Sequence, residues 1–173
     1  KQIHSNITRA GLQRNLLLGN LLLQMYLNCG SFNDVHDVFF EMPCKNKFSW
    51  NFYITSCARN GRHDHVMYAF HQMLCECLLP NEFIFVGTIS SCARNSSLQD
   101  GKQIHTRLVG SHGFESNNVV VGNALVNLYC RCNIFTESKR VFEEMEDKNV
   151  VSWSDMILTC ARHHDENEQY SIF

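Results

Sequence analysis

Hydrophobic and polar residues follow a helical period along most of the chain. The spacing i, i+3, i+4, i+7, which places apolar side chains on one face of a helix, occurs at Leu22, Met25, Tyr26 and Cys29, and again at Val35, Val38, Phe39 and Met42. Gly30 separates the two stretches and suits the left-handed residue that ends many helices. The pattern therefore predicts pairs of short amphipathic helices joined by tight turns.

Helix boundaries are marked by residues that stop or start a helix. Gly61 stands in a turn position like that of Gly30, and Pro43 and Pro80 follow second helices, where they obstruct further helix. The patterns Ser31-x-x-Asp34 and Ser97-x-x-Asp100 resemble capping boxes at the start of second helices. We therefore expect two helices in each structural unit.

The chain repeats itself at long range. Lys1-Gln2-Ile3-His4 recurs 101 residues later at Lys102, and Gly19-Asn20 and Ser49-Trp50 recur 103 residues later, at Gly122 and Ser152. The second copy therefore contains two more residues than the first between Thr106 and Gly122. The simplest place for them is the loop from Ser111 to Glu115.

A shorter period lies inside the long one. Ser56-Cys57-Ala58-Arg59-Asn60 returns 35 residues later, beginning at Ser91, and Cys-Ala-Arg appears again at Cys160. These marks divide the chain into a partial unit 1–15, complete units 16–46, 47–81, 82–118 and 119–149, and a partial unit 150–173. Each complete unit ends in Asn, and the units contain 31, 35, 37 and 31 residues.

A helical pair of this size cannot cover its own apolar faces. Neighbouring pairs must stack, so we expect an all-α fold, an α-solenoid of helix-turn-helix repeats with one helix of each pair along the concave face. The chain starts at Lys1 without a leader, inside one unit, and stops inside another. We therefore expect it to be part of a longer protein.

Composition excludes several classes of protein. The chain has 45% hydrophobic and 11% aromatic residues, which excludes disorder, and its longest apolar runs are too short to cross a membrane. Lys and Arg number 15 against 17 Asp and Glu, so any attraction to nucleic acid must be local. The nine cysteines are odd in number and lie in apolar helical patterns, which favours buried reduced thiols over disulfides.

No group of residues predicts catalysis or metal binding. His71 and Cys75 lie one helical turn apart, but the chain contains no Cys-x-x-Cys pair. Neither an acid/base pair nor an activated nucleophile can be placed in a shared pocket from this pattern. We therefore expect no enzyme activity, metal, cofactor or small-molecule substrate.

The repeated motifs resemble those of pentatricopeptide repeat proteins. The motifs are Gly-Asn-x-Leu-x-x-x-Tyr, Val-Phe-x-Glu-Met, Ser-Trp-Asn and a Pro-Asn-Glu-Phe junction at Pro80. Units of about 31 and 35 residues resemble the plant PLS subclass, which mixes short, standard and long repeats. The resemblance implies a right-handed superhelix that binds single-stranded RNA in mitochondria or chloroplasts and acts in RNA editing, splicing, processing or stabilisation.

The resemblance implies that bases are read by the fifth and last residues of a repeat. The resulting pairs are Asn20 with Asn46, Asn51 with Asn81, and Asn123 with Asn149. Side-chain amides offer a donor and an acceptor to a base edge, and the pairs imply a pyrimidine preference that leans to cytosine. Val86 with Asn118 reads no base, and Ser154 lacks its partner, so we predict 5′-pyrimidine, pyrimidine, any, pyrimidine-3′. The alternative is that these asparagines only cap helices and form turns.

Two further sets of residues follow from the register of the repeats. The resemblance implies base stacking by the apolar second residue of each unit, which is Leu17, Phe48, Phe83, Val120 or Val151. The alternative is that these side chains are core residues at helix starts. Position thirteen is Arg in four of five units, at Arg59, Arg94, Arg131 and Arg162, and Asn28 in the other.

Stacked repeats would align these arginines in a row that contacts phosphates. The alternative is a cation that stabilises a helix carboxyl end. The leading hypothesis is a pyrimidine-leaning single-stranded RNA-binding protein of organelles, which works with RNA-processing or editing proteins. The second hypothesis is a protein-interaction scaffold that binds no RNA, which the net charge of −2 suits equally well.

Overall fold

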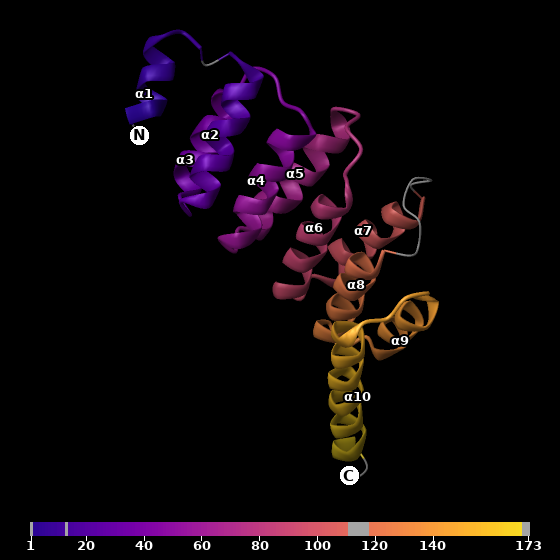
Figure 1. Cartoon of the computed structure of the whole chain (residues 1–173). Coiled ribbons are helices and arrows are strands. Elements are labelled where there is room, and N and C mark those ends of the chain that lie inside the picture. The colour runs from indigo at the N-terminus through magenta and orange to yellow at the C-terminus, as the bar shows by residue number, and fades with distance from the viewer. Residues whose placement is uncertain (1, 13, 111–117, 171–173) are drawn as a thin grey trace. The chain divides into compact units, whose positions relative to one another are not determined.

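The computed structural model describes residues 2–12, 14–110 and 118–170, and this part of the chain forms ten helices and no strand (Figure 1). The chain divides into two compact units, Lys1–Gly87 and Thr88–Phe173. Helix α6 (Glu82–Arg94) runs across the division, and each unit is described by itself. The all-α prediction is confirmed for the described residues.

The amino-terminal unit consists of stacked helical pairs. Its complete helices are α1 (Gln2–Arg9), α2 (Leu16–Asn28), α3 (Phe32–Glu41), α4 (Lys47–Arg59) and α5 (His63–Cys75). Helix α2 packs against α3 and α4, and α4 packs against α5. The largest fully buried side chains here are Leu23, Val35, Phe39, Tyr53, Ile54, Phe70, Met73 and Ile84. The predicted apolar faces of α2 and α3 therefore contribute to one core, except that Met25 is half-buried and Cys29 is exposed.

The carboxy-terminal unit repeats this arrangement. Its complete helices are α7 (Leu98–Gly110), α8 (Val119–Arg131), α9 (Phe135–Glu144) and α10 (Val150–Tyr170), and α8 packs against the other three. No helix in the described part of the chain combines the length and apolar character that a bilayer span requires. The predicted two-residue insertion at Ser111 to Glu115 lies outside the described residues.

The long repeat is visible as identical contacts in the two units. His4 Nδ1 lies 3.1 Å from the Tyr26 hydroxyl, and His105 Nδ1 lies 2.8 Å from the Tyr129 hydroxyl. Helices α2 and α8 also each pack a glycine closely against a methionine: a Cβ on Gly19 would meet Met42, and one on Gly122 would meet Met145. The sequence repeat is therefore also a repeat of packing.

The glycine turns are confirmed. Gly30 and Gly61 have φ angles of +72° and +67°, in the left-handed region that glycine adopts without steric cost. The following amide closes the turn in each case, as in the Ser31 N–H that donates to the Tyr26 carbonyl at 3.1 Å. In the second unit Asn133 takes the same conformation, which asparagine tolerates better than most residues.

The predicted capping boxes at Ser31 and Ser97 are wrong in detail. The Ser31 hydroxyl donates to the Asp34 carboxylate at 2.5 Å and accepts no bond from the helix backbone. The Ser97 hydroxyl likewise donates to Asp100, at 2.6 Å. The bond to the carboxylate is charge-assisted and strong, and it takes the place of the bond to a helix amide that the pattern predicts. A true capping box forms at the start of α4 instead, between Asn46 and Ser49.

The prediction of buried thiols holds for only part of the cysteines. All nine are free of disulfides, but only Cys57, Cys92 and Cys130 are buried, whereas five are exposed and one is half-buried. Burial raises the pKa of Cys57 and Cys92 to about 12.

The two tryptophans differ in their exposure. Trp50 is buried, whereas Trp153 is half exposed, with its ring centroid 4.9 Å from that of Phe142.

We expect the second unit to lose stability on mild acidification because of His105. Burial, and secondarily the positive charge of Arg140, lowers the pKa of His105 below its ordinary value. The unfolded chain therefore binds this proton more readily, and stability falls as the pH drops below about 6.5. Urea unfolding between pH 8 and pH 5.5 should show a smaller fall in His105→Gln than in the unsubstituted chain. An equal fall in both proteins would contradict this assignment.

Candidate nucleic-acid interface

Two of the three predicted asparagine pairs are joined by a hydrogen bond. Asn20, on α2, donates from Nδ2 to Oδ1 of Asn46 at 3.2 Å, and Asn123, on α8, donates to Asn149 at 3.1 Å. Asn149 is exposed, and the other three side chains are half-buried. Each pair therefore unites a first helix with the start of the next first helix, at a place that solvent reaches.

The third predicted pair is not joined. No hydrogen bond links Asn51 to Asn81 among the described residues, although both side chains are half-buried. Asn51 Oδ1 is itself buried without a hydrogen-bond partner, and it is unique in this among the described side chains. A buried acceptor without a donor is unfavourable, so this atom marks a real difference between the repeats.

The asparagines at the ends of the units also cap helices, as the alternative interpretation predicts. Asn46 Oδ1 accepts the Phe48 and Ser49 amides at 3.0 and 3.1 Å, and Asn149 Oδ1 does the same at α10. Asn81 and Asn118 accept amides of α6 and α8 in the same manner. Capping uses the oxygen only, so it leaves the amide nitrogen available for another partner.

Sequence reasoning missed the serines that complete the two joined pairs. Ser49 donates from Oγ to Asn20 Oδ1, and Ser152 donates to Asn123 Oδ1, both at 2.6 Å. The signal was present, because Ser49-Trp50 and Ser152-Trp153 recur at the same register. The Ser-Trp motif supported only the family resemblance. A single sequence does not show that the third residue of one unit faces the fifth residue of the unit before it.

The predicted stacking residues are exposed. Leu17, Phe48, Phe83, Val120 and Val151 are each the second residue of a first helix, with 52–67% of their surface accessible. Core residues at helix starts would be buried, so that alternative is wrong. Apolar side chains at this exposure can contact a base face, and their stacking role stays a prediction.

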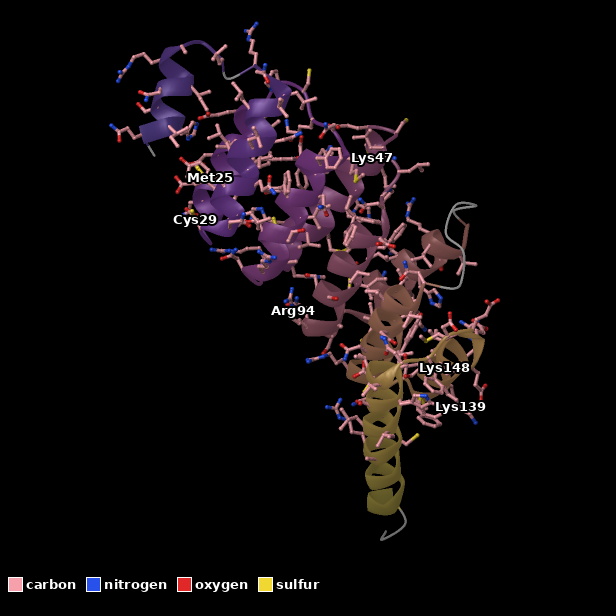
Figure 2. All side chains as sticks on the ribbon, in the orientation of Figure 1. Met25, Cys29, Lys47, Arg94, Lys139 and Lys148 are labelled. Atoms are coloured by element: carbon pink, nitrogen blue, oxygen red, sulfur yellow. The ribbon has the colours of Figure 1, made fainter. Side chains whose placement is uncertain are left out.

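The predicted phosphate contacts lie at the ends of first helices. Arg59, Arg94 and Arg131 are the last residues of α4, α6 and α8, and all are exposed. Figure 2 shows Arg94 at the end of its helix. Arg162 lies within the longer α10, and its Nη1 is 3.6 Å from Cys130 Sγ, next to Arg131. The positions suit both a phosphate contact and the favourable cation at a helix carboxyl end, worth about 0.3–1 kcal/mol.

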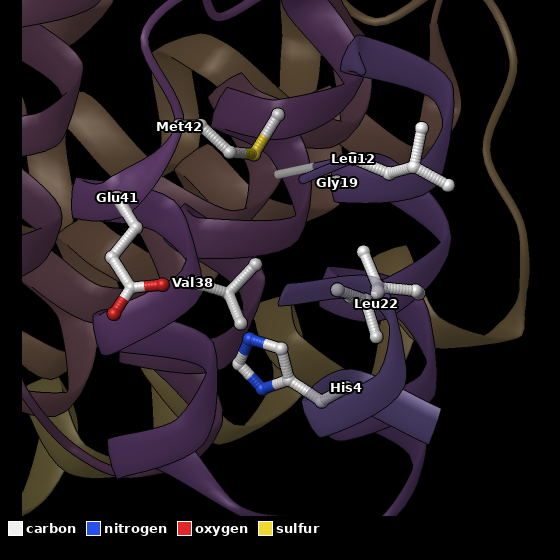
Figure 3. A pocket seen from close by; sticks show the side chains of 8 residues that line it. His4, Leu12, Gly19, Leu22, Val38, Glu41 and Met42 are labelled. Carbon is white, nitrogen blue, oxygen red and sulfur yellow. The ribbon is translucent and has the colours of Figure 1, made fainter. Parts of the chain in front are cut away.

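Shallow pockets recur at one place in the repeat. The first unit has a pocket that is lined by His4, Ile7, Leu12, Gly19, Leu22, Val38, Glu41 and Met42 (Figure 3). The second unit has the corresponding pocket around His105, Gly122 and Met145. Both pockets are mainly apolar, and each is lined by the glycine and the methionine that pack closely in its unit. Among the described residues, no three His, Cys, Asp or Glu side chains are grouped so that they could hold a metal ion.

Comparison with known proteins identifies the fold and the family. The model of the PPR repeat matches residues 20–46, 48–78 and 123–150. This chain belongs to the pentatricopeptide repeat family. A chloroplastic pentatricopeptide repeat-containing protein of Arabidopsis thaliana is 32% identical over 94% of this chain and 26% of its own length. A mitochondrial one of the same plant is 33% identical over 99% of this chain and 22% of its own length.

Solved pentatricopeptide repeat structures share the fold. The maize protein PPR10 matches with a TM-score of 0.76 at 14% identity, over 98% of this chain and 25% of PPR10. PPR10 in complex with an 18-nt psaJ RNA element matches with a TM-score of 0.77 at 17% identity, over 93% of this chain and 24% of that one. The helical-repeat solenoid is therefore the fold of this chain, which spans about a quarter of the length of these relatives.

Proposed function

We propose that this chain binds single-stranded RNA through the asparagine pairs of its repeats. The observation that carries the proposal is the pairing of Asn20 with Asn46 and of Asn123 with Asn149, in two repeats, at positions accessible to solvent. Exposed bases of single-stranded RNA are recognised by amides on their Watson–Crick edges and by apolar side chains on their faces. PPR10, whose fold this chain shares, forms a complex with an 18-nt RNA element, which supports RNA binding by this chain.

The sequence preference follows from the residues at the reading positions. We propose pyrimidines opposite the pairs that begin with Asn20, Asn51 and Asn123, and no preference opposite Val86, whose side chain forms no hydrogen bonds. Unit lengths of 31, 35, 37 and 31 residues support membership of the PLS subclass. Relatives named chloroplastic and mitochondrial support a role in organellar RNA processing or editing.

Replacing Asn20, Asn51 and Asn123 with threonine should move the preference from pyrimidine to purine at the three matching positions. Threonine is shorter than asparagine and keeps one polar group, which leaves space for a larger base. We expect a change of about 10-fold at each position, the lower end of discrimination by base-edge contacts. Fluorescence anisotropy with short pyrimidine and purine RNAs, at low and moderate salt, measures it.

The matched control uses asparagines at the opposite ends of first helices. Asn28 ends α2, and Asn60 and Asn95 donate from Nδ2 to the Ser56 and Ser91 carbonyls at 2.8 and 2.9 Å. Their replacement by threonine should leave the base preference unchanged. Equal binding of all RNAs by both sets of variants would contradict base reading.

A protein-interaction scaffold is the second candidate function. The net charge of −2 favours it, because a nucleic-acid-binding surface usually carries an excess of Lys and Arg. The same measurement separates the two functions, since a scaffold would bind none of the RNAs at moderate salt.

A further inference from the structure

A buried serine closes a ring of hydrogen bonds at each joined asparagine pair. In the first unit, the Asn46 backbone N–H donates to Ser49 Oγ at 3.2 Å, Ser49 donates to Asn20 Oδ1 at 2.6 Å, and Asn20 donates to Asn46 Oδ1 at 3.2 Å. In the second unit, Asn149, Ser152 and Asn123 form the same ring, at 3.1, 2.6 and 3.1 Å. Both serines are fully buried.

The direction of every bond in the ring follows from the backbone. The Phe48 and Ser49 amides can only donate, so the side-chain atom of Asn46 that they face must be its oxygen. The Asn20 atom that faces this oxygen must then be the amide nitrogen. The Asn20 oxygen is left facing the serine hydroxyl, which must donate to it, because an amide oxygen has no hydrogen.

The ring decides what each pair can offer to a base. Asn46 Oδ1 accepts three N–H groups, and Asn20 Oδ1 faces the buried Ser49 hydroxyl and gives one of its two lone pairs to it. The groups that take no part in the ring are one N–H of Asn20 and the N–H₂ of Asn46, and all of these are donors. Cytosine presents two adjacent acceptors, O2 and N3, on its Watson–Crick edge, whereas uracil has an N–H between its two carbonyls. A pair held in this orientation therefore favours cytosine over uracil.

The repeat of Asn51 lacks the ring. The position that corresponds to Ser49 and Ser152 is occupied by Ile84, whose side chain has no hydroxyl. Asn51 Oδ1 is the buried acceptor that has no partner, and Asn81 Oδ1 accepts only the Ile84 amide, at 3.0 Å. No bond from a serine sets the orientation of the Asn51 amide, so it can present either its donor or its acceptor.

We propose that Ser49 and Ser152 are specificity-determining residues, which hold the Asn20 and Asn123 amides in the orientation that distinguishes cytosine from uracil. The proposal rests on the proposed RNA-binding function. It divides the pyrimidine sites into two kinds: the sites of Asn20 and Asn123 select cytosine, whereas the site of Asn51 accepts both pyrimidines. The serines act through the asparagines and need no contact with RNA.

The test measures the ratio of affinities for cytosine and uracil at each site separately. Short RNAs differ only in the base at the first, second or fourth position of the four-base target, and the whole chain is titrated by fluorescence anisotropy. We expect a ratio of about 10 at the Asn20 and Asn123 sites and about 1 at the Asn51 site. Ser49→Ala should reduce the ratio toward 1 at the Asn20 site only, and Ser152→Ala at the Asn123 site only.

Three further variants keep the test decisive if an alanine variant unfolds. Ser49→Thr retains the hydroxyl and should retain the ratio, and Ile84→Thr supplies a hydroxyl and should raise the ratio at the Asn51 site. Ser138→Ala removes another buried serine, which donates to the Val126 carbonyl, and should change no ratio.

A readout without RNA separates this proposal from the proposed function. Hydrogen exchange of the side-chain N–H₂ groups, followed by NMR, should become faster at Asn20 in Ser49→Ala and stay unchanged at Asn123. Selective RNA binding with a ratio that Ser49→Ala does not alter would overturn the role of the serine and leave the proposed function intact. If the unsubstituted chain binds no RNA, both proposals fall, whatever the exchange rates.

Discussion

Replacing Arg94, Arg131 and Arg162 together with alanine should weaken RNA binding by about 100-fold without changing the base preference. Each arginine lies at position thirteen of a first helix, and all three are exposed in the carboxy-terminal unit. Contact with a phosphate places a charge-assisted bond at each repeat, and such contacts fix register but carry no sequence information. A loss of about 1 kcal/mol for each arginine multiplies to about 100-fold.

The salt dependence of binding should change with the affinity. For a single strand, the slope of log affinity against log salt concentration falls by about 0.7 for each lost phosphate contact, so the triple variant should lose about 2. The matched control is Arg107, Lys139 and Arg140 replaced with alanine, which removes three cations from the second helices α7 and α9. Equal losses in both triple variants would show that only net charge matters and would contradict a row of phosphate contacts.

Replacing Tyr53 with alanine should destabilise the amino-terminal unit by about 3–5 kcal/mol, the range for large-to-small aromatic substitutions in a core. Tyr53 is completely buried, and its ring stacks on Phe39 with centroids 4.2 Å apart and planes at 8°. Its hydroxyl lies 3.1 Å from His65 Nδ1, which ties α4 to α5. Removal of the ring leaves a cavity between α3, α4 and α5. Urea unfolding followed by circular dichroism measures the change.

Tyr53→Phe is the matched control, because it keeps the stacked ring and loses only the hydrogen bonds of the hydroxyl, to His65 and Cys57. We expect a loss of about 1–2 kcal/mol, since one hydrogen bond contributes about 0.5–1.5 kcal/mol and a bond to a thiol is weak. A cost for Tyr53→Phe as large as that for Tyr53→Ala would place the stability in the hydrogen bond and contradict the role assigned to the stacked rings.

Much of the fold could be predicted because its signals are local. The helical period of the apolar residues, the glycines at Gly30 and Gly61 and the asparagines before first helices all act within about one helical turn. The helices α2, α4, α6, α8 and α10 begin at Leu16, Lys47, Glu82, Val119 and Val150, which are the residues at which the predicted units begin. Local spacing depends only on the geometry of the backbone, so it can be recognised in one sequence.

The sequence did not decide the outcome where a residue had two possible partners or environments. Ser31 stands at a helix start, where its hydroxyl donates to Asp34 but accepts no bond from the helix backbone, and the residue types alone do not show which of these bonds form. The apolar second residues could belong to the core or to the surface. Apolar character alone did not distinguish the two, because a residue at the start of a first helix can face either the neighbouring helix or solvent.

The amino-acid sequence by itself determined the helical pairs, their register and the chemical identity of the residues at each position, since these depend on neighbours within a few residues. The tertiary structure alone decided which of those residues meet. Asn20 reaches Ser49 across 29 positions, and Asn51 meets no equivalent donor. Such contacts exist only after one helical pair has packed on the next, because packing is what places the third residue of a unit beside the fifth residue of the unit before it.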